Sequence, residues 1–346
     1  MSGRGRKILY VTTTAICLIA AVSACVLMAY SAYRESGKLL HTIFSFLLFV
    51  GVWILVSPCV LIHECGHLFF GLCTRLKPVS VCVGRLRIEG RKVRFAFSSA
   101  AGKTEFVPRG DRNVRGRLMA ASLGGATFNF IFGIVFSALF FVLPESPVLL
   151  FFALFAPLHL FEGICAILPA ELNSGRTDGE LFRVLKGNAP EAQIFVNVLT
   201  VQGILFSDTF DEVNEKLLLD TPVVREDDSA FLSLLHLRWQ YFMWKNDTER
   251  AKETLFRLEA LKDYLDEGAA AQVACDAVFM RRIADGICDE NFYVPAPAKG
   301  TCSALRAELA SNRGDREEYK KRAAAERAAG IRALESTFFE RFIQNF

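Results

Sequence analysis

The residues with the clearest chemical capacity lie in a short apolar stretch, Leu61 to Phe70, which contains the pattern H-E-x-x-H. On a helix, His63 and His67 would lie four residues apart on one face, a spacing that suits two ligands of a single zinc ion. Glu64, between them, has the position of a base that takes a proton from water at the metal. The pattern is typical of zinc-dependent hydrolases.

The surroundings of this pattern are unusually apolar for a soluble enzyme. Residues 42 to 72 contain no acidic or basic side chain except Glu64 and the two histidines. A stretch of this length and composition predicts a helix in lipid. Because ionisable groups at membrane depth are costly unless they are paired, such a cluster is a functional-site hypothesis by default.

A catalytic zinc ion needs three protein ligands and one open position, so a third ligand must come from elsewhere. Asp178 is the strongest candidate, since a carboxylate is an ordinary zinc ligand and the glycine after it permits close approach. His159 and Glu162, three residues apart in an apolar stretch, could contact each other or a neighbouring helix, and a mutually satisfied polar pair is a better interpretation than a direct catalytic part. Cys65 and Cys73 are conceivable ligands, but packing is the better interpretation for both.

Composition places the chain among membrane proteins. Of its 346 residues, 52% are hydrophobic and 31 are phenylalanine, which is too apolar for an ordinary soluble domain. The net charge of +3 is too small to indicate nucleic-acid binding. The ten cysteines show no C-x-x-C pairing, and several lie in apolar runs, so we expect reduced thiols rather than a disulfide framework.

Hydropathy and charge together predict about four transmembrane helices. The predicted spans are Ile8 to Tyr30, Leu39 to Cys73, Leu118 to Leu143 and Val148 to Leu168. An alternative for the first is a signal peptide, because Val22 to Cys25 resembles a lipoprotein cleavage box. We expect an integral, multi-pass protein of a bacterial cell membrane, with the N-terminus, the opening of the site and the C-terminal domain in the cytoplasm.

The loop from residue 74 to residue 117 is strongly basic. It holds twelve arginines and lysines against three acidic residues, so the positive-inside rule places it in the cytoplasm. Val79 to Val83 and Val93 to Phe97 read as strands, and Arg85 to Phe97 alternates around Glu89-Gly90 like a hairpin. A small sheet beside the membrane is therefore expected. Attraction of the basic residues to anionic lipid is a compatible interpretation.

The chain is expected to divide into three parts: an N-terminal tail and first helix at 1–38, a core at 39–185 that includes the basic loop, and a cytoplasmic helical domain at 186–346. Helices are predicted in this last part near 227–245, 247–263, 266–286, 302–313 and 315–343. Their pairing suggests tetratricopeptide repeats, with a generic helical bundle as the alternative. The fold class is thus mainly α, with a small membrane-associated sheet.

The combination of these features resembles the site-2 protease family of intramembrane zinc metalloproteases. The resemblance covers roughly residues 42 to 185 and rests on three segments: His63 to His67, Gly124 to Asn129, and Leu168-Pro169 followed by Asp178-Gly179. They match the family's H-E-x-x-H, a G-P-x-x-N-like segment, and an N-x-x-P loop that ends in D-G. The chain departs from these patterns at Ala126 and Ala166, where proline and asparagine are usual.

The resemblance implies that His63, His67 and Asp178 bind Zn²⁺ and that Glu64 is the general base. It also implies that Asn129, with Gly125 beside it, lies near the substrate backbone or the oxyanion. The substrate would be a membrane-embedded protein or peptide, cleaved in or near a transmembrane segment. The basic hairpin would correspond to strands that present an edge to an unwound substrate.

Two functions from other classes compete with proteolysis. The first is a non-catalytic membrane scaffold that binds client proteins through the C-terminal helical domain. Glu64 argues against it, because a purely structural metal site does not need a base. The second is a metal transporter, for which ligands repeated along a path would be expected, and only His159 and Glu162 hint at one.

Overall fold

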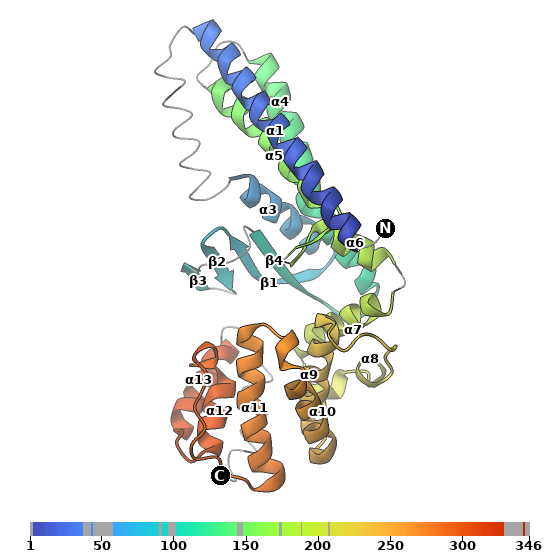
Figure 1. The fold of residues 1–346 in the computed structure, drawn as a ribbon, viewed down its shortest axis with the longest axis vertical. Coiled ribbons are helices and arrows are strands. Elements are labelled where there is room, and N and C mark those ends of the chain that lie inside the picture. The colour runs from blue at the N-terminus through green and yellow to red at the C-terminus, as the bar shows by residue number, and fades with distance from the viewer. Residues whose placement is uncertain are drawn as a thin grey trace. The chain divides into compact units, whose positions relative to one another are not determined.

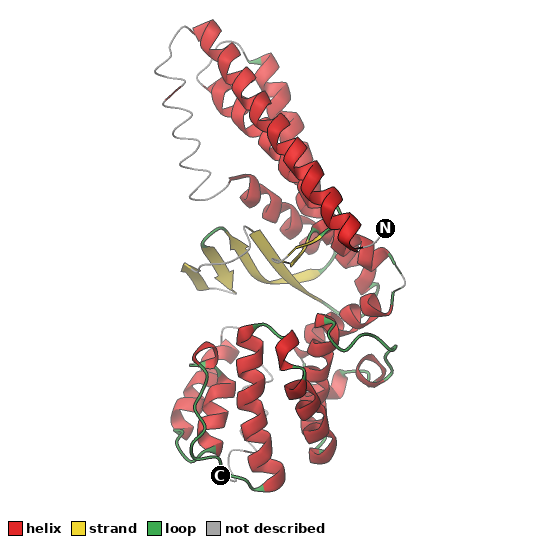
Figure 2. Ribbon diagram, in the orientation of Figure 1, coloured by secondary structure: helices red, strands yellow, loops and turns green. Residues whose placement is uncertain are grey.

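The computed structural model describes residues 3–36, 43, 58–89, 92–95, 102–143, 148–172, 175–187, 189–206, 208–328 and 342. The chain divides into two compact units. The first comprises Met1–Val107 and Asn113–Gly187, and the second comprises Pro108–Arg112 and Asn188–Phe346. Helices dominate, and a small sheet lies in the first unit, as the sequence predicts (Figure 2).

Long apolar helices make up most of the first unit. They are α1 (Gly3–Ser36), α3 (Pro58–Cys73), α4 (Val114–Val142) and α5 (Val148–Ile167). Helix α4 packs against both α3 and α5, and α1 packs along α5 (Figure 1). The buried residues between them include Cys25, Cys59 and Phe155, so these cysteines are packing residues.

Two described helices are long and apolar enough to cross a membrane, over Gly5–Leu27 and Val114–Val142. They coincide with two of the four predicted spans. Pro58–Cys73 and Leu154–Ile167, which belong to the other two, form shorter apolar helices. Apart from residue 43, the first half of the predicted span 39–73 lies outside the described residues, as does the predicted turn at residues 144–147.

The small sheet has four strands in the order β3-β2-β1-β4. They are β1 (Leu76–Val83), β2 (Leu86–Glu89), β3 (Lys92–Phe95) and β4 (Gly102–Pro108). Strands β2 and β3 pair antiparallel from Leu86 opposite Phe95 to Glu89 opposite Lys92, which confirms the predicted hairpin. The strand β4 was not predicted, and it lies at the edge of the sheet beside β1.

The ribbon formed by β2 and β3 has two unlike faces. Side chains alternate along a strand, so partners opposite each other share a face. One face carries Leu86, Ile88, Val93 and Phe95, and the other carries Arg87, Glu89, Lys92 and Arg94. Val93 and Phe95 are 62% and 86% exposed. The β2–β3 ribbon thus has exposed apolar side chains on one face, and its basic positions lie on the other.

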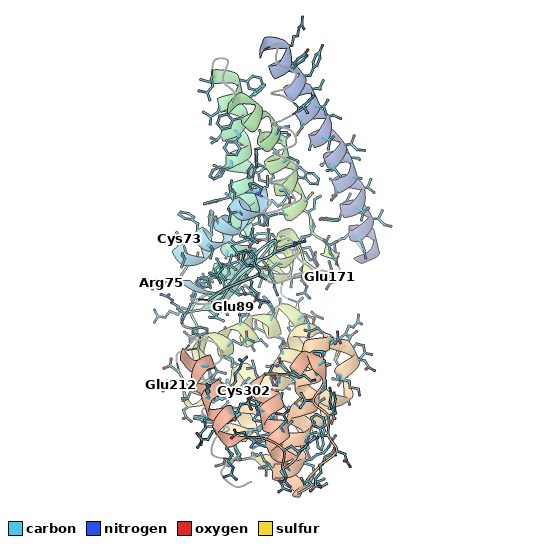
Figure 3. All side chains as sticks on the ribbon, turned by 90° about the vertical axis from the view of Figure 1, so that its left-hand side faces the viewer. Cys73, Arg75, Glu89, Glu171, Glu212 and Cys302 are labelled. Atoms are coloured by element: carbon cyan, nitrogen blue, oxygen red, sulfur yellow. The ribbon has the colours of Figure 1, made fainter. Side chains whose placement is uncertain are left out.

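Helix α3 ends where the sheet begins, and α4 stabilises this junction. Arg75, labelled with Cys73 in Figure 3, adopts the left-handed region at φ 61° and turns the chain into β1. Arg117 of α4 donates a hydrogen bond to the Thr74 carbonyl at 2.7 Å and another to the Arg75 carbonyl. These carbonyls are orphan acceptors at the end of a helix, so Arg117 satisfies them and fixes the direction in which the sheet leaves α3.

The second unit is a set of helices in which each packs on its neighbours. The predicted helices are confirmed as α9 (Ser229–Trp244), α10 (Thr248–Ala260), α11 (Glu267–Asp285) and α12 (Cys302–Ala310). The helix predicted at 315–343 is confirmed as far as α13 (Arg316–Ala328) reaches, and most of the remainder lies outside the described residues. The unpredicted helices are α7 (Pro190–Leu205) and the short α8 (Lys216–Leu219). Single 3-10 turns cover Phe210–Glu212, Lys262–Tyr264 and Ala296–Ala298. Asn246 and Asn312, at the predicted turns, adopt positive φ.

A fully buried ion pair joins α11 to α12 in this unit. Arg306 donates to the Asp276 carboxylate at 2.7 Å and to the Ser303 hydroxyl at 3.0 Å, and both charged side chains have no exposure. His236 of α9 lies 3.6 Å from the other Asp276 oxygen. Burial alone would raise the pKa of Asp276, but Arg306 and His236 outweigh it and hold this pKa below its usual range.

This ion pair predicts both a mutational and a pH effect on the second unit. Asp276→Asn leaves the Arg306 guanidinium buried without its counter-charge, which should destabilise the unit by about 3–5 kcal/mol. Because the folded-state pKa is depressed, the stabilisation is complete above the ordinary aspartate value of about 3.9 and is lost as pH falls below it. Hydrogen exchange of α11 and α12 in the full chain measures both. Asp285→Asn, at an exposed ion pair, is the control.

Candidate metal centre

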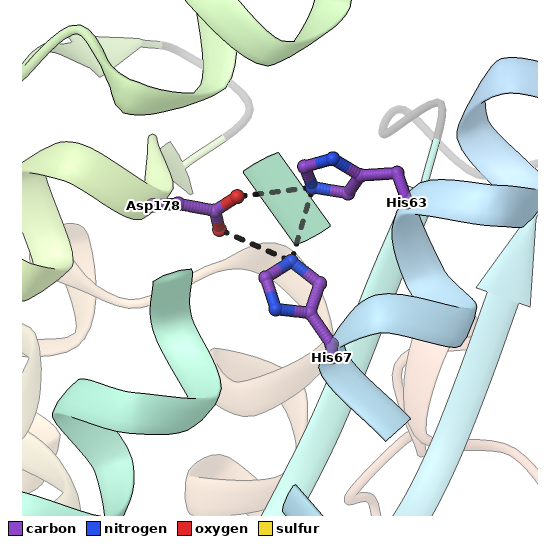
Figure 4. Close-up of side chains that lie close together, drawn as sticks. All are labelled: His63, His67 and Asp178. Atoms are coloured by element: carbon purple, nitrogen blue, oxygen red, sulfur yellow. Dashed lines mark hydrogen bonds and ion pairs between the residues drawn. The ribbon is translucent and has the colours of Figure 1, made fainter. Parts of the chain in front are cut away.

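The three predicted metal ligands come together in the first unit. Nε2 of His63 lies 3.0 Å from Nε2 of His67, and the two oxygens of Asp178 lie 3.0 Å from His63 and 3.3 Å from His67 (Figure 4). One ligand atom from each residue falls within 4.8 Å of the others. His63 and His67 come from successive turns of α3, whereas Asp178 begins α6 (Asp178–Lys186), more than a hundred residues later.

The position of the ring hydrogen on His67 indicates why this cluster would attract a cation. Nδ1 of His67 lies 2.7 Å from the carbonyl oxygen of Ala121. A carbonyl can only accept, so Nδ1 carries the hydrogen, and Nε2 of the neutral ring is a lone pair. That lone pair points at Nε2 of His63 and at the Asp178 carboxylate. In this neutral form the lone pair of His67 and the Asp178 carboxylate converge on one point beside His63, which a proton or a metal ion would neutralise.

The donor set and its spacing fit zinc. Tetrahedral zinc with ligand bonds of about 2.0–2.1 Å sets neighbouring ligand atoms about 3.3 Å apart, close to the distances between these three side chains. The hydrogen bond from His67 to Ala121 is the kind of outer contact that orients a metal-bound imidazole. Two imidazoles and one carboxylate leave a fourth position open, as in catalytic zinc sites.

Glycines let α4 closely approach α3, the helix that carries His63 and His67. A Cβ at Gly124 would lie 2.9 Å from the carbonyl carbon of Gly66, so the two backbones are in contact where α3 and α4 cross. One residue on, a Cβ at Gly125 would lie 2.6 Å from Cδ2 of His63. Gly125 therefore makes room for the His63 ring. This is a packing contribution, and its predicted role near the substrate stays a prediction.

The start of α6 is fixed by Thr177, which places Asp178 at the first helical position. The Thr177 hydroxyl accepts a hydrogen bond from the Glu180 amide at 3.3 Å and donates to the Leu168 carbonyl at 2.7 Å. Gly179 packs against the end of α5, where a Cβ would lie 2.5 Å from the carbonyl carbon of Ile167. The cap and the glycine together orient the Asp178 carboxylate towards α3.

Asp178 remains ionised over the whole working range of pH. Burial alone would raise the pKa of Asp178, but without a metal ion His67 and His63, in their protonated forms, attract the carboxylate and donate hydrogen bonds to it, and so lower this pKa to about 2. A carboxylate that is already deprotonated needs to release no proton when it binds a cation. Asp178 is thus prepared electrostatically for the role of a ligand.

Glu64 lies behind the cluster and is held by the edge strand β4. Its side chain is only 3% exposed, and one carboxylate oxygen accepts a hydrogen bond from the Thr104 hydroxyl. The other oxygen faces Gly102, where a Cβ would lie 3.0 Å from the carboxyl carbon. The backbone of β4 therefore passes next to the predicted base, at a position where only glycine leaves room for the carboxylate.

A substitution at Thr104 should change the rate of the predicted hydrolysis and leave the zinc content unchanged. Thr104→Val removes the hydroxyl that orients Glu64, and the hydrolysis that the sequence predicts should slow about 10-fold, the size of one hydrogen bond to a charged group. Zinc content should not change, because Thr104 does not contact the ligands. Thr127→Val is the matched control, since that hydroxyl bonds only the Leu123 carbonyl within α4. Equal slowing in both variants would contradict the role of Thr104.

Asn129 lies next to the cluster, but both ends of its amide face histidines. Its Nδ2 lies 3.1 Å from Nδ1 of His63, and its Oδ1 lies 3.0 Å from Nδ1 of His159. The predicted pairing of His159 with Glu162 is therefore wrong: one ring nitrogen of His159 contacts Asn129, and the other, Nε2, has no hydrogen-bond partner. The other possibility, contact with a neighbouring helix, is the one that the structure shows for His159.

The other conceivable ligands lie outside the cluster. The side chains of Cys65 and Cys73 are exposed, and neither belongs to the group of convergent ligand atoms, which in the described chain consists of His63, His67 and Asp178. The sequence prediction missed Thr104 and Gly102. The β-branched and aromatic residues Thr104, Phe106 and Val107, bounded by Gly102 and Pro108, are the signal that could have revealed their strand.

Comparisons of the chain with protein-family models, with curated proteins and with solved structures found no match. The assignment of a function therefore depends on the geometry of the described residues. That geometry is a partly buried His-His-Asp cluster with an adjacent buried carboxylate, next to the edge of a sheet.

Proposed function

We propose that this chain is an intramembrane zinc metalloprotease that hydrolyses peptide bonds in or near transmembrane segments. The observation that carries the proposal is the convergence of His63, His67 and Asp178 on one point, with the Glu64 carboxylate held beside it by Thr104. Zinc at such a site supplies Lewis-acid activation of water and of a carbonyl group. A structural site would need neither the open position nor the oriented Glu64.

In this mechanism the protein residues would hold the metal ion, orient the groups around it and transfer protons. His63, His67 and Asp178 would hold the ion, and the Ala121 carbonyl fixes the ring of His67. Glu64 would accept the proton of the attacking water and pass it to the departing amine. The Thr104 hydroxyl keeps the Glu64 carboxylate in one orientation during both transfers.

The edge strand β4 offers a way to present a substrate. A helical substrate has its carbonyls engaged in hydrogen bonds, so it must unwind before a peptide bond can be attacked. Strand β4 is the last in the sheet order and passes next to Glu64 at Gly102. An extended peptide added to this edge would form backbone hydrogen bonds and lie beside the base.

Apolar exposure supports a membrane location with four spans. Large apolar side chains of α1 and α4 are widely exposed, including Ile19 at 68%, Ile134 at 64% and Phe141 at 79%. Lipid would cover them, since contiguous apolar faces of this size are unusual on a monomer in water. With the basic loop inside, the N-terminus, the opening of the site and the second unit would lie in the cytoplasm of a bacterial cell.

The test combines zinc dependence with the position of cleavage. Purified full-length chain is reconstituted with membrane protein extracts, and new peptide termini are identified with zinc, after chelation, and after zinc is restored. We expect termini within apolar segments that vanish on chelation and return with zinc. Stoichiometric zinc without any such termini would favour the alternative, a membrane scaffold that binds clients through its second unit.

A further inference from the structure

A line of three side chains leads from the metal cluster into the interior of the helices. His63 of α3, Asn129 of α4 and His159 of α5 are joined by contacts of 3.1 Å and 3.0 Å through the Asn129 amide. Asn129 and His159 have no exposed surface. Each helix therefore contributes one member, and the order of contacts is ligand, amide, imidazole.

The chemistry of a metal ligand sets the direction of these hydrogen bonds. Nε2 of His63 faces His67 and Asp178, so ligation through Nε2 leaves the ring proton on Nδ1. That N–H needs an acceptor, and its only neighbour in the line is the Asn129 amide. The two ends of an amide have nearly the same shape, so rotation by half a turn brings Oδ1 to His63 without repacking. The amide NH₂ then faces His159.

His159 is suited to accept from that NH₂. Its ring lies among Phe132, Phe136 and Phe155, with centroids 6.2, 5.4 and 6.3 Å away. An imidazolium in such an apolar, fully buried place would lose its hydration without gaining a counter-charge. A neutral ring has one acceptor nitrogen. With the amide turned, Nδ1 is that acceptor and faces the Asn129 NH₂, and the ring hydrogen lies on Nε2, for which the described residues supply no hydrogen-bond partner.

We propose that His159 is a positioning residue of the metal centre. By accepting from the Asn129 amide it directs Oδ1 of Asn129 to His63, which holds the His63 ring with its proton on Nδ1 and its lone pair on the metal side. His159 touches neither the metal nor the substrate and acts only through Asn129. This inference rests on the proposed metal site. It gives the buried Asn129 and His159 side chains a role that is distinct from transport.

The test measures zinc affinity of the full-length chain in detergent by competition with a chromogenic chelator. Asn129→Leu and His159→Phe should each weaken zinc binding by about 10–100-fold, the usual effect of losing an outer contact to a ligand. The double variant should bind zinc no more weakly than Asn129→Leu alone, because the two residues act in series. His159→Gln keeps an acceptor and should restore most of the affinity.

Leu158→Ala, a buried residue adjacent in α5, is the control for general loosening of the helices and should bind zinc like wild type. The absorption of bound Co²⁺ should shift in His159→Phe and not in the control. His159→Ala replaces His159→Phe if that variant does not fold. Additive losses in the double variant, or wild-type affinity without His159, would overturn the inference. Wild-type chain that binds no zinc would instead overturn the proposed function.

Discussion

Replacement of Glu64 by glutamine is expected to abolish proteolysis while zinc stays bound. Glutamine has nearly the shape of glutamate, and Glu64 is not among the three convergent ligands. The amide cannot accept the proton of the attacking water, so we expect the rate to fall by about 10²–10⁴-fold, the usual contribution of a general base. Rates are measured on a reconstituted membrane substrate, and zinc is measured by mass spectrometry on the same preparation.

The matched control for this variant is Cys65→Ser, on the same helix and adjacent to Glu64, where the side chain is exposed and outside the cluster. It should retain both zinc and activity. Undiminished cleavage by the Glu64→Gln variant would show that another group takes the proton. Loss of zinc in Glu64→Gln would show instead that the buried carboxylate supports the cluster, and the rate would then carry no information about the base.

Local spacing predicted the part of the site that one helix carries. His63, Glu64 and His67 lie within two turns of α3, and their relation follows from helical geometry alone. The hairpin β2–β3 was equally local, since its strands alternate on either side of one turn. Asp178 is the strongest candidate from the sequence because the glycine after it permits close approach and because the charge topology predicts it on the same side of the membrane as His63 and His67.

What the sequence did not reveal depends on contacts between distant segments. Thr104 reaches Glu64 across forty residues, and nothing in the order of residues 102 to 108 indicates that this strand begins beside the helix of Glu64. His159 was paired with Glu162 because they are three residues apart, whereas packing of α4 against α5 gives it Asn129 instead. Helix α7 was missed because apolar residues lie on all of its faces. Its sequence therefore lacks the periodicity that reveals a surface helix.

Replacement of Asp178 by asparagine is expected to weaken zinc binding by more than about 100-fold, beyond the 10–100-fold usual for outer contacts. The carboxylate supplies the only negative charge among the three ligands, and both of its oxygens lie within 3.3 Å of the ligand histidines. Asparagine keeps the volume and the N-terminal position in α6, so loss of fold does not account for the effect. Zinc affinity is measured by chelator competition.

The control for this variant is Glu171→Gln, which removes an exposed carboxylate from strand β5 (Glu171–Leu172) near the start of α6. It should bind zinc as wild type does. Wild-type affinity in Asp178→Asn would exclude Asp178 as the third ligand. Reduced affinity together with cleavage restored by excess zinc would agree with ligation and separate it from catalysis. If excess zinc restores cleavage in Asp178→Asn and not in Glu64→Gln, the two results together show that Asp178 holds the ion and that Glu64 is the base.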